Sequence, residues 1–243
     1  MNLENIKRSF ISGLPAVASI AVGVVPIAVL IGYFDVSRKL ILGWGVLSYI
    51  VGVAVMKLPL YQFFVVRVLH PRLTHFWLGC SQGIVSATSE LGSALMFFMF
   101  VVPDLTFTQL VGFGVAAGSV EAVVLPFMRN PFQGTPLEHH ANDILSRSDG
   151  QHRHQWLGVV ERVLASITHA TTRGLVYVGL TTGSVVPASI AFLTFAGLDG
   201  AGYYAHIERW PFNQIKVVLK FYAYFFAMTV IQTTSFLIFY ATR

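Results

Sequence analysis

Long apolar runs, each interrupted by few or no charged residues, follow one another along the chain. The runs from Phe10 to Phe34 and from Phe221 to Thr242 contain no charged residue, and each exceeds the ~20 residues needed to cross a hydrocarbon core of ~30 Å. Strands of a membrane β-barrel would alternate in polarity over about 10 residues, and in lipid only the helix then remains to satisfy the backbone. We therefore predict an all-α membrane helix bundle with about seven transmembrane helices, at residues 10–34, 40–66, 76–102, 106–128, 156–180, 185–205 and 217–241.

The composition excludes an ordinary water-soluble protein. Of the 243 residues, 55% are hydrophobic and only 11% are charged, whereas soluble domains have about 25% charged residues. Lys7 and Arg8 before the first run and the Ala16-Val17-Ala18 triplet resemble a secretory signal. The triplet lies near the start of the run instead of after it, so we expect this helix to be retained. We predict one integral membrane domain, residues 1–243, in the cytoplasmic membrane of a bacterium or archaeon.

The basic residues outside the predicted helices favour one orientation of the bundle. One side has Arg38, Lys39 and Arg243. The side shared by the N-terminus and the even-numbered connections has ten: Lys7, Arg8, Arg67, Arg72, Arg129, Arg147, Arg153, Arg209, Lys216 and Lys220. This bias places the N-terminus in the cytoplasm. The net charge of +5 then reflects topology and contact with the lipid bilayer, and it indicates no nucleic-acid partner.

A long polar connection, residues 129–155, is predicted on the cytoplasmic side. It contains four of the eight histidines: His139, His140, His152 and His154. Histidine-rich segments can bind metal ions, but these residues lack a fixed ligand spacing, and histidines in a solvated loop are the simpler interpretation. The single cysteine, Cys80, excludes an intrachain disulfide and a cysteine-based metal cluster. We predict no cofactor and no metal site.

Polar residues recur at helical spacing inside two of the predicted spans. In the fifth span they are Arg162, Ser166, His169 and Arg173, with Glu161 starting an adjacent line. In the third span they are Gln82, Ser86, Ser89 and Ser93, with Glu90 beside them. Residues at these spacings share one face of a helix. We therefore expect the two polar faces to face each other inside the bundle.

Ionisable residues at membrane depth are costly and indicate a functional site unless they pair with one another. Carboxylates occur at Glu90, Glu121, Glu161 and Asp199, and the available cations are Lys57, Arg162 and Arg173. Asp199 could instead lie near the outer interface. His169 titrates nearest to neutral pH among these residue types. The adjacent Glu161 and Arg162 fit either a structural pair or a functional one.

Glycines four residues apart would allow helices to approach closely. Gly79 and Gly83 have this spacing in the third span, and Gly114 and Gly118 have it in the fourth. Such pairs occur both inside bundles and at contacts between protein chains. The sequence leaves open interior packing and an oligomer contact.

Four stretches together resemble the YhfC family of membrane peptidases, which is related to the glutamic intramembrane proteases and CAAX-protease-like proteins. Ser89-Glu90-Leu91-Gly92-Ser93 resembles the family's EELGR-like segment, and Gly114 through Glu121 resembles GxGHGxxE. Glu161 through Ala170 closely resembles ERxxAxxxHA, and Phe195 through Asp199 resembles a His-x-x-x-Asp segment. The resemblance covers roughly residues 76–205. It implies an intramembrane-protease-like fold, with Glu90, Glu121 and His169 as the candidate catalytic residues.

The departures from the family pattern fall where chemistry would be expected. Ser89 stands in place of a glutamate, Ser93 of an arginine, and Ala117 and Phe195 of histidines. A glutamic protease needs a carboxylate base and an oxyanion-stabilising group. This chain lacks some of the residues that would provide each of them.

Three functions therefore remain, of which we favour the first. It is a non-catalytic binding or scaffold subunit whose partner is another membrane protein or a second copy of the chain. In that case Glu161, Arg162, Arg173, Asp199 and Lys57 form a structural polar core. The second is an active glutamic-type peptidase using Glu90, Glu121 and His169. The third, a proton-coupled transporter, could use the same carboxylates, but no inverted repeat is visible.

Overall fold

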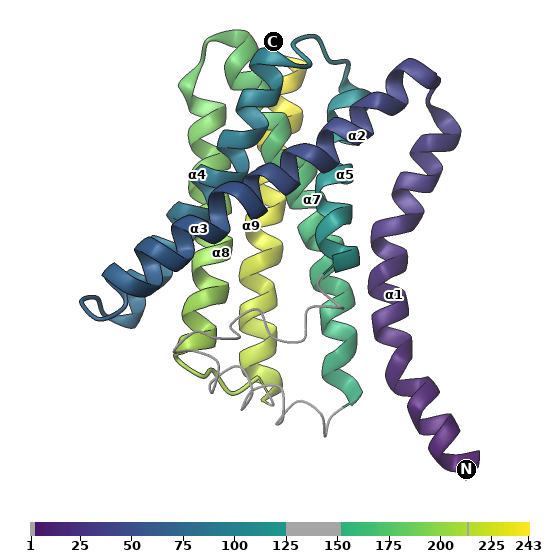
Figure 1. Ribbon diagram of the computed structural model, residues 1–243, viewed down its shortest axis with the longest axis vertical. Helices are drawn as coiled ribbons and strands as arrows, with labels where there is room; N and C mark the ends of the chain where they lie inside the picture. Colours follow the sequence, from purple (N-terminus) through teal and green to yellow (C-terminus); the bar gives the residue numbers. More distant parts are fainter. Residues whose placement is uncertain (1–2, 125–151, 213) are drawn as a thin grey trace.

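The computed structural model describes residues 3–124, 152–212 and 214–243, and this part of the chain is a bundle of long helices (Figure 1). The helices are α1 (Leu3–Tyr33), α2 (Val36–Ile50), α4 (His75–Phe100), α5 (Phe107–Val124), α7 (His152–Thr182), α8 (Val185–Ile207) and α9 (Ile215–Ala241). Six helical segments in the described part are long and apolar enough to cross a membrane. The predicted all-α membrane bundle is confirmed.

The second span departs from a regular α-helix. After α2 the chain continues without a break through a π-helical segment η1 (Val51–Lys57), a short α3 (Leu58–Leu60) and a second π-helical segment η2 (Tyr61–Leu69). Pro59 explains the change, because proline has no N–H and its ring crowds the carbonyl four residues earlier. The wider turn before it is closed by the Leu58 N–H donating to the Val53 carbonyl. The resulting long helix runs obliquely across the bundle (Figure 1).

Helix α7 is the central helix and carries three of the seven charged residues inside the bundle, Glu161, Arg162 and Arg173. Every residue from 168 to 179 is buried, and α7 packs against α1, α4, α5, α8 and α9. It is not among the six apolar segments, which its charged residues explain. Because other helices surround it, those residues contact protein instead of lipid.

One boundary differs from the prediction for residues 129–155. Helix α7 begins at His152, so His152 and His154 belong to its first turn and not to a loop. The predicted start was the first apolar residue, Trp156, whereas the helix extends about one turn beyond its apolar part. His139 and His140 lie outside the described residues.

The glycine pairs pack inside the bundle. A Cβ added at Gly83 of α4 would overlap the Ala196 carbonyl of α8, and one added at Gly114 of α5 would overlap the Ala170 backbone of α7. Small residues thus bring the backbones of the central helices together.

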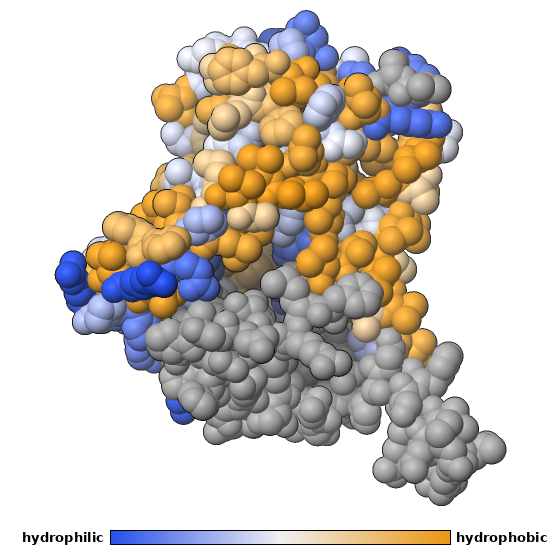
Figure 2. Space-filling model, viewed as in Figure 1, coloured by the Kyte–Doolittle hydropathy of each residue, from blue (hydrophilic) through white to orange (hydrophobic). Residues whose placement is uncertain are grey.

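The outer faces are apolar, and Figure 2 shows hydrophobic residues along α1 and α2. Val17 and Leu193, for example, are 62% and 69% exposed.

Gly83→Ala is expected to lower the free energy of unfolding by about 1–3 kcal/mol, because the added methyl group overpacks the contact between α4 and α8. Gly92→Ala in the same helix is the matched control, since no heavy atom lies within 4 Å of its added Cβ. Alanine there should be neutral or stabilise by up to about 1 kcal/mol. Thermal unfolding in detergent measures both, and equal melting temperatures would contradict the close approach at Gly83.

Candidate functional site

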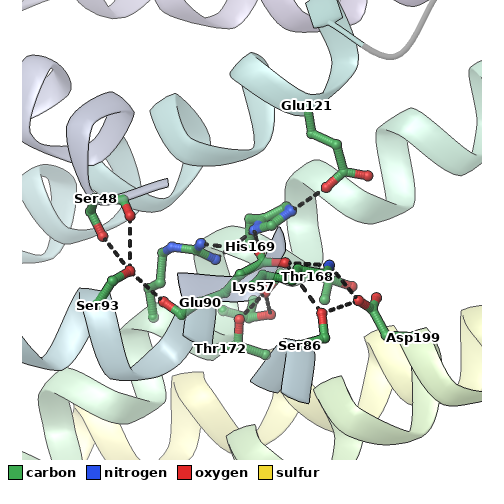
Figure 3. Close-up of polar contacts among 12 residues, drawn as sticks. Ser48, Lys57, Ser86, Glu90, Ser93, Glu121, Thr168, His169, Thr172 and Asp199 are labelled. Atoms are coloured by element: carbon green, nitrogen blue, oxygen red, sulfur yellow. Dashed lines mark hydrogen bonds and ion pairs between the residues drawn. The ribbon is translucent and has the colours of Figure 1, made fainter. Parts of the chain in front are cut away.

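A cluster of charged side chains lies in the interior of the bundle, with Glu90 of α4 at its centre (Figure 3). Glu90 is 2% exposed. Its Oε1 accepts hydrogen bonds from Lys57 Nζ at 2.8 Å and from Ser86 Oγ at 3.3 Å. The Oε2 atom faces Arg173 Nη2 of α7 at 3.6 Å, which is an ion-pair distance without a hydrogen bond. Glu90 is therefore held between two cations.

Lys57 joins three helical segments through this cluster. From the end of η1 its Nζ also donates to Asp199 Oδ2 of α8 at 3.0 Å. Ser86 Oγ contacts the same Asp199 oxygen, and because a hydroxyl has a single hydrogen, it can donate to only one of the two carboxylates at a time. Gly52 makes the approach of η1 possible, since a Cβ there would lie 3.0 Å from the Glu90 Cα and 2.7 Å from Ser93 Oγ.

His169 of α7 connects the Glu90 side of the cluster with Glu121 of α5. Its Nδ1 contacts Arg173 Nη1, and because arginine can only donate, Nδ1 is the acceptor. The proton of the neutral ring is then assigned to Nε2, which donates to Glu121 Oε2 at 2.7 Å. The rings of Tyr49 and Phe195 lie edge-on to the imidazole, with centroids at 5.6 and 5.7 Å. Both imidazole nitrogens are occupied by protein groups.

Arg162 forms the second branch of the cluster. Its Nη1 donates to Glu121 Oε1 and its Nη2 donates to Glu161 Oε1. The other Glu161 oxygen accepts from the Tyr222 hydroxyl of α9 at 3.3 Å. Adjacent residues on a helix point in different directions, yet the length of the arginine lets it contact both carboxylates.

A cavity of about 160 Å³ lies beside the cluster. Its polar lining comes from Glu121, Glu161, Arg162, Thr168, His169 and Asp199. At ~30 Å³ for each water molecule it has room for about five waters. About a third of each side chain of Asp199 and Glu161 is exposed (34% for both). Glu90 does not line this cavity.

The cluster contains four carboxylates and three cations, and each carboxylate contacts a lysine or an arginine. The pairs are Glu90 with Lys57, Asp199 with Lys57, Glu121 with Arg162 and Glu161 with Arg162. Pairing of this kind is the usual condition under which charges are tolerated in an apolar interior. Asp199 lies in this network and not at the outer interface.

The four positions that depart from the family pattern provide no polar group to the cavity. Ser89 Oγ donates to the Val85 carbonyl of its own helix, and Ser93 Oγ donates to the Ser48 carbonyl of α2 at 2.8 Å. Ala117 is fully buried, and Phe195 lines the cavity with its ring. Within the described ranges, no group of three or more His, Cys, Asp or Glu side chains is placed to hold a metal ion.

Two contributors were not singled out from the sequence. Ser48 and Tyr222 each lie in an apolar run, where a single serine or tyrosine does not by itself indicate a polar contact. Chemically, the arrangement can neutralise buried charge and can hold a few waters beside Glu121 and His169.

No family model, curated protein or solved structure matches the chain.

Proposed function

We propose that this protein is a non-catalytic binding or scaffold subunit of a membrane assembly, with an intramembrane-protease-like fold related to the YhfC family and a cytoplasmic N-terminus. The observation that supports the proposal is how the carboxylates are paired and which of them reach the cavity. Each one in the core is paired with a lysine or an arginine, and Glu90, the candidate base, does not line the cavity.

A general base must reach a water molecule and accept its proton. Glu90 is 2% exposed and is bonded to Lys57, so it reaches no water in the cavity. Both oxygens of Glu121 are occupied, one by Arg162 and the other by His169. A water molecule in the cavity would have to compete with Arg162 and His169 for these oxygens.

An oxyanion also needs donors aimed at the place where its charge develops. Ala117 and Phe195, which replace the histidines of the family pattern, provide none. Arg162 and His169 line the cavity, but Nη1 and Nη2 of Arg162 and Nε2 of His169 each already bond a carboxylate. The cavity therefore has polar walls whose hydrogen-bonding groups are largely engaged with one another.

A glutamic-type peptidase remains the second candidate, because Glu121 and His169 form a 2.7 Å contact and both line the same cavity. In that function Glu121, assisted by His169, would activate water. Glu90 would then hold Arg173 and Lys57 in place.

The test is a cleavage assay with the purified native chain in lipid nanodiscs and a set of membrane-embedded and membrane-proximal peptides. The scaffold proposal expects no cleavage, together with recovery of a stoichiometric membrane partner or a second copy after mild solubilisation. Cleavage that falls ~10²–10⁴-fold in Glu121→Gln, and that is unchanged in the matched control Glu208→Gln, would establish the peptidase instead. Glu208 is suitable because it pairs with His75 at the surface.

A further inference from the structure

The turn between α8 and α9 borders a small, open cavity away from the charged cluster. The cavity measures about 280 Å³ and is lined by Trp210, Pro211, Val217 and Lys220. Its walls are an indole ring, a proline ring, a valine and the stem of a lysine. These walls suit an apolar part of a ligand, and the ammonium group of Lys220 provides a positive charge at the edge of the cavity.

Two lysines of α9 provide positive charge here: Lys220 lines the cavity, and Lys216 lies one turn before it on the same helix. Lys216 and Lys220 are four residues apart, so they lie on the same side of the helix, and both are exposed. Neither makes an ion pair with any carboxylate in the described part of the chain. The nearby Glu208 is engaged with His75 at 2.9 Å. Two ammonium groups therefore remain available to an anion from outside the protein.

Trp210 is held in place by neighbouring aromatic rings. Its ring meets Tyr204 of α8 at 6.1 Å and Phe221 of α9 at 6.3 Å, both edge-on. Tryptophan is enriched where membrane helices reach the headgroup region. A fixed indole beside two lysines at the ends of two membrane helices is therefore typical of the lipid interface.

The surface next to the lysines is apolar and leads toward the hydrocarbon core. Ile215 and Leu219 are 63% and 61% exposed and lie one residue before Lys216 and Lys220. Each lysine is thus flanked by an aliphatic side chain on the adjacent face of α9. A ligand that bonds both lysines would have its apolar part beside these residues.

We propose that this turn is a binding site for an anionic phospholipid. Lys216 and Lys220 contact the phosphate, the cavity at Trp210 takes the glycerol and the first part of an acyl chain, and the tail follows Leu219 along α9. Charge complementarity selects an anion, and the apolar walls select a lipid over a soluble phosphate compound. The site is independent of the scaffold function and of the cluster around Glu90.

The test compares lipid retention by the full chain after purification from nanodiscs of defined composition, read by native mass spectrometry. The native protein should retain phosphatidylglycerol in preference to phosphatidylcholine with the same acyl chains. Each lysine near an anionic headgroup contributes about fivefold in affinity, so Lys216→Gln with Lys220→Gln should lower the preference by about thirtyfold. Lys39→Gln, an exposed lysine at the other end of the bundle, is the matched control and should change nothing.

Equal retention of the two lipids by the native protein would overturn the proposal, as would a preference that survives the double substitution or falls equally in Lys39→Gln. Displacement of the lipid by glycerol phosphate at similar concentration would assign the site to a soluble phosphate compound and would overturn it too. Melting of the double variant in phosphatidylcholine should equal that of the native chain. A lower melting temperature there would mean that the lysines stabilise the fold without lipid, which also contradicts the proposal.

Discussion

Lys57→Met is expected to destabilise the protein by about 3–5 kcal/mol, because removing one partner of a buried ion pair leaves an uncompensated charge. Lys57 is the only lysine of the charged cluster and contacts two carboxylates, Glu90 at 2.8 Å and Asp199 at 3.0 Å. After its removal the only cation left beside Glu90 among the described residues would be Arg173, at 3.6 Å. Asp199 would lose its cation among the described residues. The measurement is equilibrium unfolding in detergent or bicelles.

A second substitution tests whether the lost charge is the cause. In the Lys57→Met background, Glu90→Gln removes the charge that was left without its ammonium group, so part of the lost stability should return. Lys39→Met is the control for loss of an exposed lysine and should change stability by less than about 0.5 kcal/mol. Unchanged unfolding in Lys57→Met would mean that water solvates Glu90, contrary to its burial.

Arg162→Leu is expected to cost a similar amount, about 3–5 kcal/mol, since it removes the guanidinium from both Glu121 and Glu161. Glu161→Gln should cost much less, up to about 1 kcal/mol, because a third of that side chain is exposed and water screens the pair. Arg162 would still hold Glu121 in that variant. Thermal unfolding of the two variants side by side measures the difference.

The same pair of variants distinguishes the two branches of the cluster. If Glu161→Gln proved as destabilising as Arg162→Leu, the contact with Glu161 would account for the whole contribution of Arg162 to stability, and its contact with Glu121 would contribute little. Arg72→Leu serves as the control for removal of an exposed arginine.

The fold could be predicted from the sequence because apolar runs of about 20 residues have few alternatives in a membrane. The helical period also predicted that the polar face of α4 would meet the polar face of α7, and this holds for Glu90, which faces Arg173. It does not hold for the serines of that face, since Ser86 contacts Asp199 of α8 and Ser93 contacts the Ser48 carbonyl of α2. Those predictions needed only the geometry of one helix at a time.

The partners within the cluster could not be predicted in the same way. That Lys57 contacts Asp199 depends on how α2 and η1 cross the bundle and on the wider turns before Pro59, which shift the register of the helix. The role of Tyr222 depends on how α9 is rotated against α7, which the spacing of residues within α9 does not set. Contacts between helices distant in sequence are set by tertiary packing, and no spacing rule within one helix reports them.

The central position of α7 has a consequence for membrane insertion during synthesis. Each arginine or acidic residue at the middle of a lone helix opposes insertion by about 2.5–3.5 kcal/mol, and α7 carries Glu161, Arg162 and Arg173. The carboxylates that contact its two arginines, Glu121 of α5 and Glu90 of α4, precede it in the chain. When α7 reaches the bilayer, its counter-charges are therefore already there, and α7 enters by associating with α4 and α5 instead of dissolving in lipid alone.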